Sequence, residues 1–348
     1  MSYTTKQWML KEPTGDNIDV TKAFNLITKQ VSARDLKEGE VLAKTVYISH
    51  DPAQRCWIHR NNVEGRLYRT PIGAGEPMEA FGVAEVLETR NKSYKTGDLI
   101  VATVHWTEYG IITPDNIYFK SFGDAADMVT LGLTGMTAYF GLLNVGAATP
   151  KDSTIVVSAA ASSTGAIVCQ IAKNVLGIKN VIGIAGSDAK CAMLTRDAGC
   201  DIALNYKSPT FRQEFEAATP NDIDLYFDNV GGEVTDMALL RMKDRGRVVV
   251  CGAISIYDRI HEKGGNVGIS RASWLQVICH QVKIEGFIIF QFADQFPRAL
   301  GDLATWTQEG KLKLMKDIIQ TDITEVPKGM STLFKGENNG KLITQLKV

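Results

Sequence analysis

The first third of the chain carries a pattern typical of short strands. Before residue 125, runs of β-branched and aromatic residues with near-alternating polarity recur between glycines and other turn residues. This texture favours a strongly curved, barrel-like β domain. The predicted strands are residues 40–49, 81–88, 95–102 and 106–112.

From Thr154 onward, short apolar runs alternate with segments that have helical spacing. This alternation predicts right-handed βαβ units and a doubly wound parallel sheet with helices on both faces, an α/β fold. A stretch of small apolar residues with glycines, 125–143, precedes this region and favours close helix packing. After a first strand at Thr154, the predicted strands are residues 180–185, 202–205, 223–227 and 247–251, and the predicted helices are residues 189–198 and 211–218.

The turn after the first of these strands has the layout of a dinucleotide-binding turn. Residues 154–173 read as strand, tight turn and helix, and a helix N-terminus offers unpaired N–H groups and a positive dipole end to a pyrophosphate. The usual fingerprint has three glycines, whereas Ala160 and Ser162 take the first two places here and only Gly165 remains. Similar turns occur in α/β proteins without nucleotides, so this turn alone leaves both interpretations open.

The end of the second strand predicts which dinucleotide binds. NAD-binding units place there an acidic residue that accepts hydrogen bonds from ribose hydroxyls, but this chain has Gly186 and Ser187. Lys190 lies one turn into the next helix and Tyr206 follows the third strand, so with Ser187 they could bind the 2′-phosphate of NADPH. Asp188 counts against this, although it would also serve as a helix N-cap, and Lys190 alone fits a solvated lysine equally well. We favour NADP(H).

Ligands of such sheets bind at the carboxyl ends of the strands. The segments expected to meet at this edge are residues 159–165, 186–190, 206, 229–232 and 251–257.

The last residues, 341–348, read as a strand that needs a partner. We expect this strand to rejoin the N-terminal β domain, which makes that domain discontinuous. The predicted domains are residues 1–126 with 297–348, and residues 127–296.

Composition limits the partners. The chain has 348 residues and a net charge of −1, so it has no basic field for nucleic acid or anionic membranes. Its N-terminal residues lack an apolar core of signal-peptide length, and no uninterrupted apolar run approaches the ~20 residues of a membrane span. The six cysteines are scattered, which favours reduced and mostly buried thiols. We expect a soluble, cytoplasmic protein that binds neither nucleic acid nor membrane.

Several further stretches together resemble one known family. They are residues 46–52 with Arg55, residues 132–139, 183–191, 226–233, 251–255 with Tyr257, 285–288 and 338–341. The resemblance is to the zinc-independent medium-chain dehydrogenases/reductases, in the leukotriene B4 dehydrogenase/prostaglandin reductase branch. This branch includes plant double-bond reductases and microbial NADPH-dependent alkenal/one reductases. The likeness covers nearly the whole chain.

The resemblance implies a GroES-like β-rich domain, built from both ends of the chain, and a Rossmann NADP-binding domain. It places Lys190 and Tyr206 at the 2′-phosphate, and Asn229 and Cys251 at the nicotinamide half. Tyr257 falls near the nicotinamide ribose and the substrate carbonyl, although a packed loop tyrosine is the alternative. The predicted cofactor-binding residues are Ser162, Thr164, Gly165, Gly186, Ser187, Lys190, Tyr206, Asn229, Cys251, Gly252, Ile254, Tyr257, Phe287, Ile288 and Asn338; the predicted substrate contacts are Tyr47 and Tyr257, and Tyr257 is the predicted catalytic residue.

The cysteine pattern argues against a catalytic zinc. Metal-dependent relatives need a cysteine, a Gly-His-Glu stretch and a second cysteine, because zinc prefers thiolate and imidazole ligands. This chain has no cysteine between Cys56 and Cys169 and no Gly-His-Glu stretch. We interpret the close Cys56 and His59 as incidental and predict no metal.

We therefore expect NADPH-dependent reduction of the C=C bond of an α,β-unsaturated aldehyde or ketone. The Tyr257 hydroxyl or the ribose 2′-hydroxyl would stabilise the charge that develops on the carbonyl oxygen. The proton for the α-carbon would come from Tyr257 or from water. Two alternatives stay open: a quinone or biosynthetic reductase of the same family, and an NADPH-binding protein without turnover.

Three segments bear on substrate size and assembly. Relatives often carry an aromatic residue after Asp51-Pro52, where this chain has Ala53-Gln54, so the space for substrate would be reshaped. The glycine-containing residues 258–270 read as a mobile loop or a plain surface loop. An apolar strand near 286–290 could pair two copies at a sheet edge, and we expect a homodimer, although a buried core strand fits the same residues.

Overall fold

The structure is a computed structural model that describes residues 1–60, 67–257 and 269–347. Nearly all of the loop predicted at 258–270 lies outside these described residues. Internal contacts divide the chain into two units. The first, called the β unit, comprises Met1–Leu133 and Lys316–Val348, and the second, called the α/β unit, comprises Thr134–Met315.

These boundaries differ from those expected at 126/127 and 296/297. The second boundary lies later because the helix α9 (Phe296–Gln308) packs within the α/β unit. Its Trp306 stacks on Tyr139 of the same unit, with 5.8 Å between the ring centroids. Gln170 of the α/β unit also accepts a hydrogen bond from the N–H of Lys313, at 2.6 Å.

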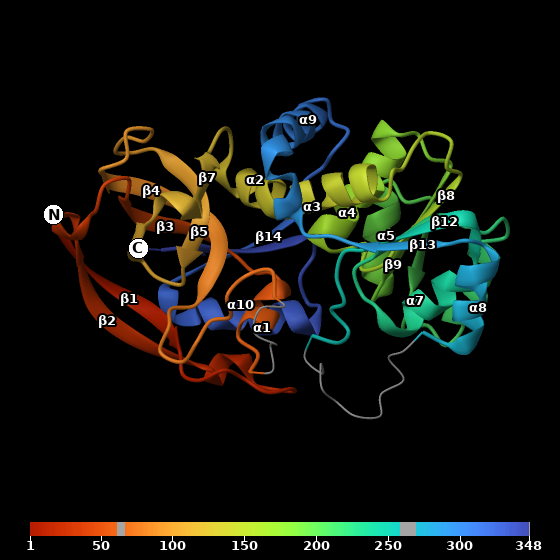
Figure 1. The fold of residues 1–348 in the computed structure, drawn as a ribbon, viewed down its shortest axis with the longest axis horizontal. Helices are drawn as coiled ribbons and strands as arrows, with labels where there is room; N and C mark the ends of the chain where they lie inside the picture. The colour runs from red at the N-terminus through yellow and green to blue at the C-terminus, as the bar shows by residue number, and fades with distance from the viewer. Residues whose placement is uncertain (61–66, 258–268, 348) are drawn as a thin grey trace. The chain divides into compact units, whose positions relative to one another are not determined.

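A seven-stranded sheet forms most of the β unit (Figure 1). Its order is β14-β15-β3-β4-β5-β7, and β6 also pairs with β3. The last strand pairs antiparallel with β3, with Ile343 opposite Ser49, so the expected return of the terminal strand is confirmed. The strands are β3 (Val41–Ser49), β4 (Glu79–Thr89), β5 (Leu99–His105), β6 (Tyr109–Ile112), β7 (Ile117–Lys120), β14 (Lys316–Thr321) and β15 (Lys341–Leu346).

Two predicted strands of the β unit begin later than expected. The strand β5 begins at Leu99 because Lys95 and Asp98 form a turn, in which the Lys95 N–H donates to Asp98 Oδ2 at 3.1 Å. The strand β6 begins at Tyr109. A separate antiparallel hairpin, β1 (Ser2–Leu10) with β2 (Phe24–Ser32), was not predicted, nor was β14.

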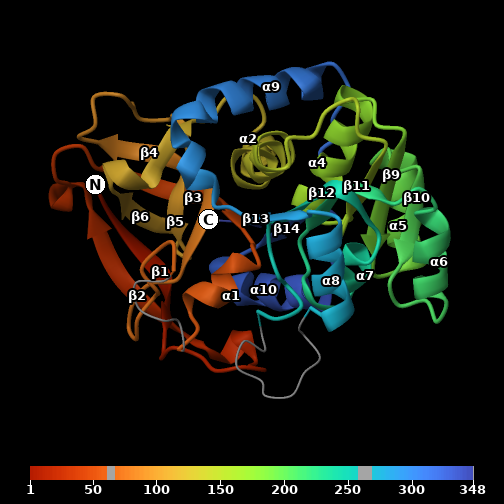
Figure 2. The ribbon, with the colours of Figure 1, turned by 45° about the vertical axis from the view of Figure 1, so that its right-hand side comes forward.

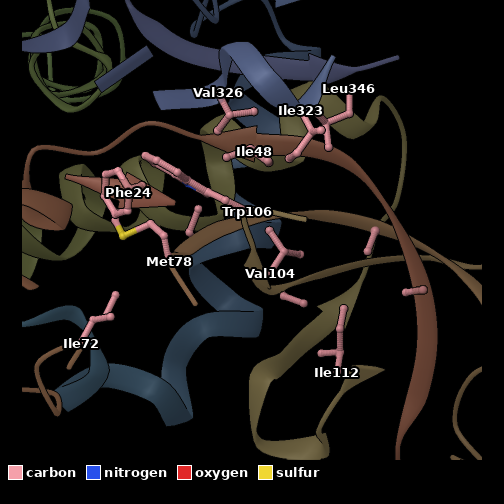
Figure 3. Close-up of a cluster of buried hydrophobic side chains, with 14 of the residues drawn as sticks. Phe24, Ile48, Ile72, Met78, Val104, Trp106, Ile112, Ile323, Val326 and Leu346 are labelled. Carbon is pink, nitrogen blue, oxygen red and sulfur yellow. The ribbon is translucent and has the colours of Figure 1, made fainter. Parts of the chain in front are cut away.

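The core of the β unit surrounds Trp106 (Figure 3). This side chain is fully buried, and its ring lies 5.1 Å from that of Phe24. Ile323 and Val326, from the C-terminal part of the chain, belong to the same cluster. Burial of one such side chain contributes about 1.5–3 kcal/mol. The helical segments of the unit are α1 (Ala53–Trp57), α2 (Ala125–Val129), α10 (Val326–Lys335), and the 3₁₀ turns η1 (Val20–Lys22), η2 (Ala33–Asp35), η3 (Pro114–Asn116) and η8 (Ile323–Glu325).

The α/β unit contains a six-stranded sheet in the order β10-β9-β8-β11-β12-β13. All neighbouring strands pair in parallel. Counted from β8, this is the 3-2-1-4-5-6 order of dinucleotide-binding sheets. The predicted fold class, a β-rich domain with a Rossmann-type parallel sheet, is thus confirmed. The strands are β8 (Thr154–Val157), β9 (Asn180–Ala185), β10 (Ile202–Asn205), β11 (Ile223–Asp228), β12 (Met242–Val250) and β13 (Lys283–Gly286).

Helices cover both faces of this sheet (Figures 1 and 2). On one face, Phe215 of α6 and Met237 of α7 share a buried cluster with Tyr226. On the other face, Leu194 of α5 lies against Gly183. The helical segments are α3 (Met136–Tyr139), η5 (Phe140–Val145), α4 (Ser163–Gln170), η6 (Ile171–Val175), α5 (Asp188–Asp197), α6 (Phe211–Ala218), α7 (Gly232–Leu239), α8 (Arg271–Cys279), η7 (Ile289–Gln295) and α9.

The edge strand lies earlier than the expected 286–290. Parallel pairing places Val250, the last residue of β12, opposite Gly286, the last residue of β13. Pairing stops where β12 stops, so Phe287 and Ile288 follow the strand instead of belonging to it.

One stretch, Ala125–Val145, is long and apolar enough to cross a membrane by length and composition alone. It joins α2, the π-helical η4 (Thr130–Gly135), α3 and η5 into 21 helical residues. Polar residues such as Asp127 and Thr134 interrupt it, so it does not contradict the expectation that no uninterrupted apolar run approaches the length of a span. Its most apolar 18 residues are 78% buried inside the protein, as in a helix that packs within a protein core.

Candidate functional site

The centre of the candidate site is the point where the strand order reverses. The chain proceeds from β8 to β9 on one side of the sheet and from β11 to β12 on the other. The connections that leave β8 and β11 therefore diverge, and open α/β sheets bind ligands in the crevice at such a point. The turns that follow β8 and β11 carry several of the predicted cofactor residues.

The turn after β8 fits closely against the helix α4. Ala159 has a φ of 46°, which costs a residue with a Cβ atom about 1 kcal/mol. Ser162 caps the helix, because its Oγ accepts a hydrogen bond from the N–H of Gly165 at 3.1 Å. A Cβ atom on Gly165 would lie 2.5 Å from the carbonyl oxygen of Ala159. The one fingerprint glycine that remains is therefore required by packing, and half-buried Thr164 lies beside it in the first turn.

A buried carboxylate organises the turn after β11. Asp228 is 2% exposed, and its Oδ1 accepts hydrogen bonds from the N–H groups of Val230 and Gly231, both at 2.9 Å. Further donors to this carboxylate are the hydroxyls of Ser158, Tyr226 and Thr235. Burial, with the nearby Asp228 charge, raises the pKa of Tyr226 well above its ordinary value, so its hydroxyl keeps the proton that it donates.

Asn229 joins the two turns of the crevice. Its N–H donates to Ser158 Oγ at 2.9 Å, and its Nδ2 donates to the carbonyl oxygen of Ser158 at 2.8 Å. A carboxamide has a second side-chain N–H and an acceptor oxygen. Asn229 is therefore fixed by the protein and retains groups of a kind that bind a nicotinamide carboxamide.

The turn after β12 is attached to the same place. The N–H groups of Cys251 and Gly252 donate to the carbonyl oxygen of Asp228, at 2.8 and 3.1 Å, and the N–H of Ile254 donates to that of Asn229 at 3.2 Å. Burial, with the negative charge of Asp228, raises the pKa of Cys251 to about 12. Its thiol is therefore protonated at neutral pH and is not a nucleophile.

Tyr257 closes this turn. Its hydroxyl oxygen accepts a hydrogen bond from the N–H of Ala253 at 3.0 Å, and it lies 3.2 Å from the position of a Cβ atom on Gly252. Accepting this bond uses an oxygen lone pair and not the phenolic proton. The protein thus holds the hydroxyl of the predicted catalytic residue at the carboxyl edge of the sheet.

Three predicted phosphate-binding residues come together where β9 and β10 end. Ser187 is the N-cap of α5, and its Oγ accepts a hydrogen bond from the N–H of Lys190 at 3.3 Å. The N-cap is thus Ser187, and Asp188 is the first helical residue. Tyr206 lies over Gly186, since a Cβ atom there would be 3.0 Å from Cε1 of the tyrosine ring.

Several groups that favour an anion belong to this part of the sheet edge. A helix N-terminus, the Ser187 hydroxyl and the Lys190 ammonium group lie within one short stretch, and each favours an anion. Lys207, which the sequence analysis did not single out, adds a second ammonium group 5.8 Å from the centre of the Tyr206 ring.

Phe287 and Ile288 follow the edge strand β13. The ring of Phe287 lies against Gly141, where a Cβ atom would be 2.7 Å from Cζ of the phenylalanine. Phe287 is half-buried and Ile288 is exposed. The contact of these two residues with the nicotinamide half of the cofactor stays a prediction.

Two predicted site residues, Tyr47 and Asn338, belong to the β unit. Tyr47 is half-buried in β3. Burial raises its pKa, the negative charge of Asp124 adds to this effect, and Lys316 opposes it. Asn338 is buried, and its Nδ2 donates to the carbonyl oxygen of Gly340 at 2.9 Å. Their roles stay predictions.

The segment that departs from the family pattern begins α1. Ala53 is half-buried, whereas Gln54 is fully buried. The side chain of Gln54 accepts a hydrogen bond from the N–H of Asp51 and donates to the carbonyl oxygen of Glu79, both at 2.9 Å. Gln54 therefore holds the local backbone, and the expected effect of Ala53 on the space for substrate stays a prediction.

No group of three or more His, Cys, Asp or Glu side chains suited to a metal ion occurs among the described residues. His59 Nε2 lies 3.0 Å from Asp16 Oδ1. Burial raises the pKa of Cys56 to about 11, which disfavours its thiolate. The six cysteines are recorded outside disulfides, but only Cys169 and Cys200 are buried, fewer than expected.

Three residues that hold the turns after β8 and β11 by hydrogen bonds were not predicted from the sequence: Ser158, Asp228 and Thr235. A carboxylate directly after the apolar residues Leu225, Tyr226 and Phe227 was the available signal for Asp228, because a buried charge needs several donors. No local signal marks Thr235, which reaches Asp228 from the next helix.

Comparison with known proteins gives a consistent result. A family model described as the N-terminal domain of oxidoreductase matches residues 6–119, and one described as zinc-binding dehydrogenase matches residues 163–305. Prostaglandin reductase 1 of Bos taurus is 33% identical over 99% of this chain and 98% of its own. The NADP(+)-dependent 2-alkenal reductase of Nicotiana tabacum is 34% identical over 88% of each chain. The crystal structure of CurA from Vibrio vulnificus in complex with NADPH matches with a TM-score of 0.87 and 28% identity, over 99% of each chain.

Proposed function

The chain belongs to the zinc-independent medium-chain dehydrogenases/reductases, in the prostaglandin reductase and 2-alkenal reductase branch, and is an NADP(H)-dependent oxidoreductase; from this we propose that it reduces the C=C bond of α,β-unsaturated aldehydes and ketones. In this reaction NADPH supplies the hydride. The α/β unit is the proposed NADP-binding domain, and the β unit is the proposed substrate domain.

The observation that carries the proposal is the anchored hydroxyl of Tyr257. The N–H of Ala253 holds it at 3.0 Å, in a turn whose own N–H groups are bound to the carbonyl oxygen of Asp228. A hydroxyl fixed in this way can donate a hydrogen bond to a substrate carbonyl oxygen as negative charge develops there. The ribose 2′-hydroxyl is the second candidate donor.

The same bond bears on the proton that the α-carbon must receive. In this bond the phenolic oxygen of Tyr257 is the acceptor, so the proton that it shares belongs to the N–H of Ala253 and not to the hydroxyl. In our proposal Tyr257 or water supplies the proton for the α-carbon, and Tyr257 also touches the substrate together with Tyr47.

The carboxyl edge of the sheet supplies a binding group for each part of the cofactor. We assign the pyrophosphate to the first turn of α4 because its N–H groups face an anion well. The proposed contacts are Ser162, Thr164 and Gly165 for the pyrophosphate, Gly186, Ser187, Lys190 and Tyr206 for the 2′-phosphate ribose, and Asn229, Cys251, Gly252, Ile254, Tyr257, Phe287, Ile288 and Asn338 for the nicotinamide half.

We also propose a homodimer that forms through β13. This strand lies at the edge of the sheet, and an unpaired strand edge is a template for another strand. Apolar side chains are exposed on β13, just after it and on α8: Ile284, Ile288, Phe290, Trp274, Leu275 and Ile278. Size-exclusion chromatography with light scattering tests this, and a monomer at micromolar concentration would contradict it. We further propose a cytoplasmic location, which six cysteines recorded outside disulfides favour.

The test of the reaction measures NADPH consumption with an alkyl enal, a phenyl-substituted enone, a quinone and a saturated aldehyde, with NADH in parallel and products identified by mass spectrometry. We expect saturated carbonyl products from the enal and the enone, and a preference for NADPH. Turnover of the quinone alone would favour the quinone reductase alternative. NADPH binding without turnover of any compound would favour a non-catalytic protein.

Replacement of the catalytic hydroxyl sharpens this test. We expect Tyr257→Phe to lower kcat about a hundredfold, the usual scale for one acid catalyst, with little change in the KM for NADPH. Tyr94→Phe, in a turn of the β unit between β4 and β5, is the matched control and should retain kcat. Unchanged kcat in Tyr257→Phe would assign the proton and the oxyanion contact to other groups.

A further inference from the structure

A carboxylate stands beside the proposed 2′-phosphate site. Asp188 is the first residue of α5, between Ser187 and Lys190, and it is exposed. A carboxylate that turned toward a 2′-phosphate would repel it, and it would instead favour the ribose hydroxyl of NADH. The orientation of this side chain therefore matters for the choice between the two cofactors.

Asn205 holds the Asp188 carboxylate. It is the last residue of β10, and its Nδ2 donates to Asp188 Oδ1 at 2.8 Å. The Oδ1 atom of Asn205 accepts a hydrogen bond from the N–H of Lys207 at 3.0 Å. Because this acceptor is engaged by a backbone donor, the carboxamide has one favourable orientation, with its NH₂ group toward Asp188.

Other charged side chains lie near the pair of Asp188 and Asn205. Lys190 belongs to the first turns of α5, and the Nζ of Lys207 lies 5.8 Å from the centre of the Tyr206 ring. Glu214 is a nearby second carboxylate, but its Oε1 already accepts hydrogen bonds from the hydroxyls of Ser208 and Thr210. Asp188 is thus the carboxylate that stands next to the proposed phosphate ligands in the sequence of α5, and Asn205 is the side chain that binds it.

We propose that Asn205 sets the preference for NADPH by holding the Asp188 carboxylate away from the 2′-phosphate. This rests on the proposed assignment of Ser187, Lys190 and Tyr206 to that phosphate. Asn205 is then a positioning residue, which acts through Asp188 and not by contact with the cofactor. Loss of its NH₂ group releases the carboxylate, which weakens binding of NADPH but not of NADH.

The test is a double-mutant cycle read out by the dissociation constants of NADPH and NADH, measured by nicotinamide fluorescence. We expect Asn205→Ala to weaken NADPH about fivefold, as for one exposed like-charge contact, and to leave NADH nearly unchanged. Asp188→Asn alone should change little, because that carboxylate is already held. The double variant should bind NADPH nearly as well as the unmodified chain, and added salt should reduce the defect of Asn205→Ala.

A second variant covers the case in which Asn205→Ala disturbs the turn. Asn205→Asp keeps an acceptor for the Lys207 N–H but replaces the donor with a negative charge, so it should weaken NADPH more than Asn205→Ala does. The matched control is Asn180→Ala, at the opposite end of β9, where Nδ2 donates to the carbonyl oxygen of Ala218. This control should leave the ratio of the two dissociation constants unchanged.

Two outcomes would overturn the proposal. One is that Asn205→Ala weakens the binding of NADPH and NADH equally. The other is that adding Asp188→Asn to Asn205→Ala does not restore the binding of NADPH. Equal affinity of the unmodified chain for both cofactors would overturn the phosphate assignment and the proposal together. Because no enone takes part in these titrations, failure of the proposed reaction would appear only in the turnover assay.

Discussion

We expect the buried side chain of His50 to lower the free energy of unfolding of the protein in mild acid. Its ring is 1% exposed, and its Nε2 lies 2.8 Å from Thr344 Oγ1 of the C-terminal strand. The ring also lies directly on the backbone of Gly329, where a Cβ atom would be 2.2 Å from Nε2. Burial lowers the pKa of His50 from 6.5 to about 4; the Lys341 charge adds to this, and the Asp51 carboxylate opposes it.

The size of the effect follows from the two pKa values. Between pH 6.5 and about 4 the unfolded chain binds a proton at His50 that the folded protein does not bind, so the free energy of unfolding falls as pH falls. One pKa unit corresponds to about 1.4 kcal/mol. Relative to neutral pH, His50 therefore lowers the free energy of unfolding by about 2 kcal/mol at pH 5 and by about 3 kcal/mol at pH 4.

Hydrogen–deuterium exchange read by mass spectrometry can follow this loss, after correction for the intrinsic effect of pH on exchange. We expect peptides from β3 and β15 to lose protection between pH 6.5 and 5, more than peptides from β8. His50→Asn should be less stable throughout but should lose most of this pH dependence. His105, whose pKa is also lowered by burial, contributes equally with and without this substitution.

His280→Asn is the matched control, since that ring lies at the surface beside Asp244, with 2.6 Å between Nδ1 and Oδ1. It should retain the pH dependence of the unmodified chain. The same pH dependence in His50→Asn as in the unmodified chain would refute the assignment to His50. Aspartates whose pKa is lowered in the folded protein change the free energy of unfolding only in stronger acid, below their ordinary pKa of 3.8.

Two further predictions concern packing and charge. Gly165→Ala should displace the turn at Ala159, lower the free energy of unfolding by about 1–3 kcal/mol and weaken NADPH binding. Gly301→Ala is the control, because a Cβ atom there meets nothing within 4 Å, and it should be neutral or stabilising. Thermal unfolding and NADPH titration check both variants, and equal effects would contradict the packing argument. Lys341→Met should lower the free energy of unfolding by about 3–5 kcal/mol, because it removes the ion-pair partner of the buried Asp51 carboxylate. In urea unfolding, the double variant with Asp51→Asn should regain much of this free energy. No regain would show that the pair is not what stabilises the site.

Several elements of the α/β unit were predictable because apolar runs bounded by turn residues mark them in the sequence. The strands β9 and β10 and the helix α6 have the predicted ends, since strands of parallel sheets are mostly apolar. The strand β2 escaped prediction because most of its side chains are exposed, so no alternation marks it. The strand β14 is likewise never fully buried along its length.

The site was predictable only where its residues adjoin a strand in the sequence. Gly165, Ser187 and Tyr206 follow recognisable strands, so their convergence could be inferred from the parallel sheet. The bonds of Asn229 and Asp228 to Ser158 depend on the pairing of β11 with β8, which places Phe227 opposite Val157. These strands are not consecutive, and no local pattern specifies their register.

The place of β15 has a consequence for synthesis. On a ribosome the α/β unit, Thr134–Met315, emerges complete before the last strands of the β unit exist. Until then the Tyr47–Ser49 end of β3 lacks the neighbour that it later pairs with, and such an edge can pair with other nascent chains. Removal of β15, Lys341–Leu346, should therefore lower the yield of soluble protein during translation.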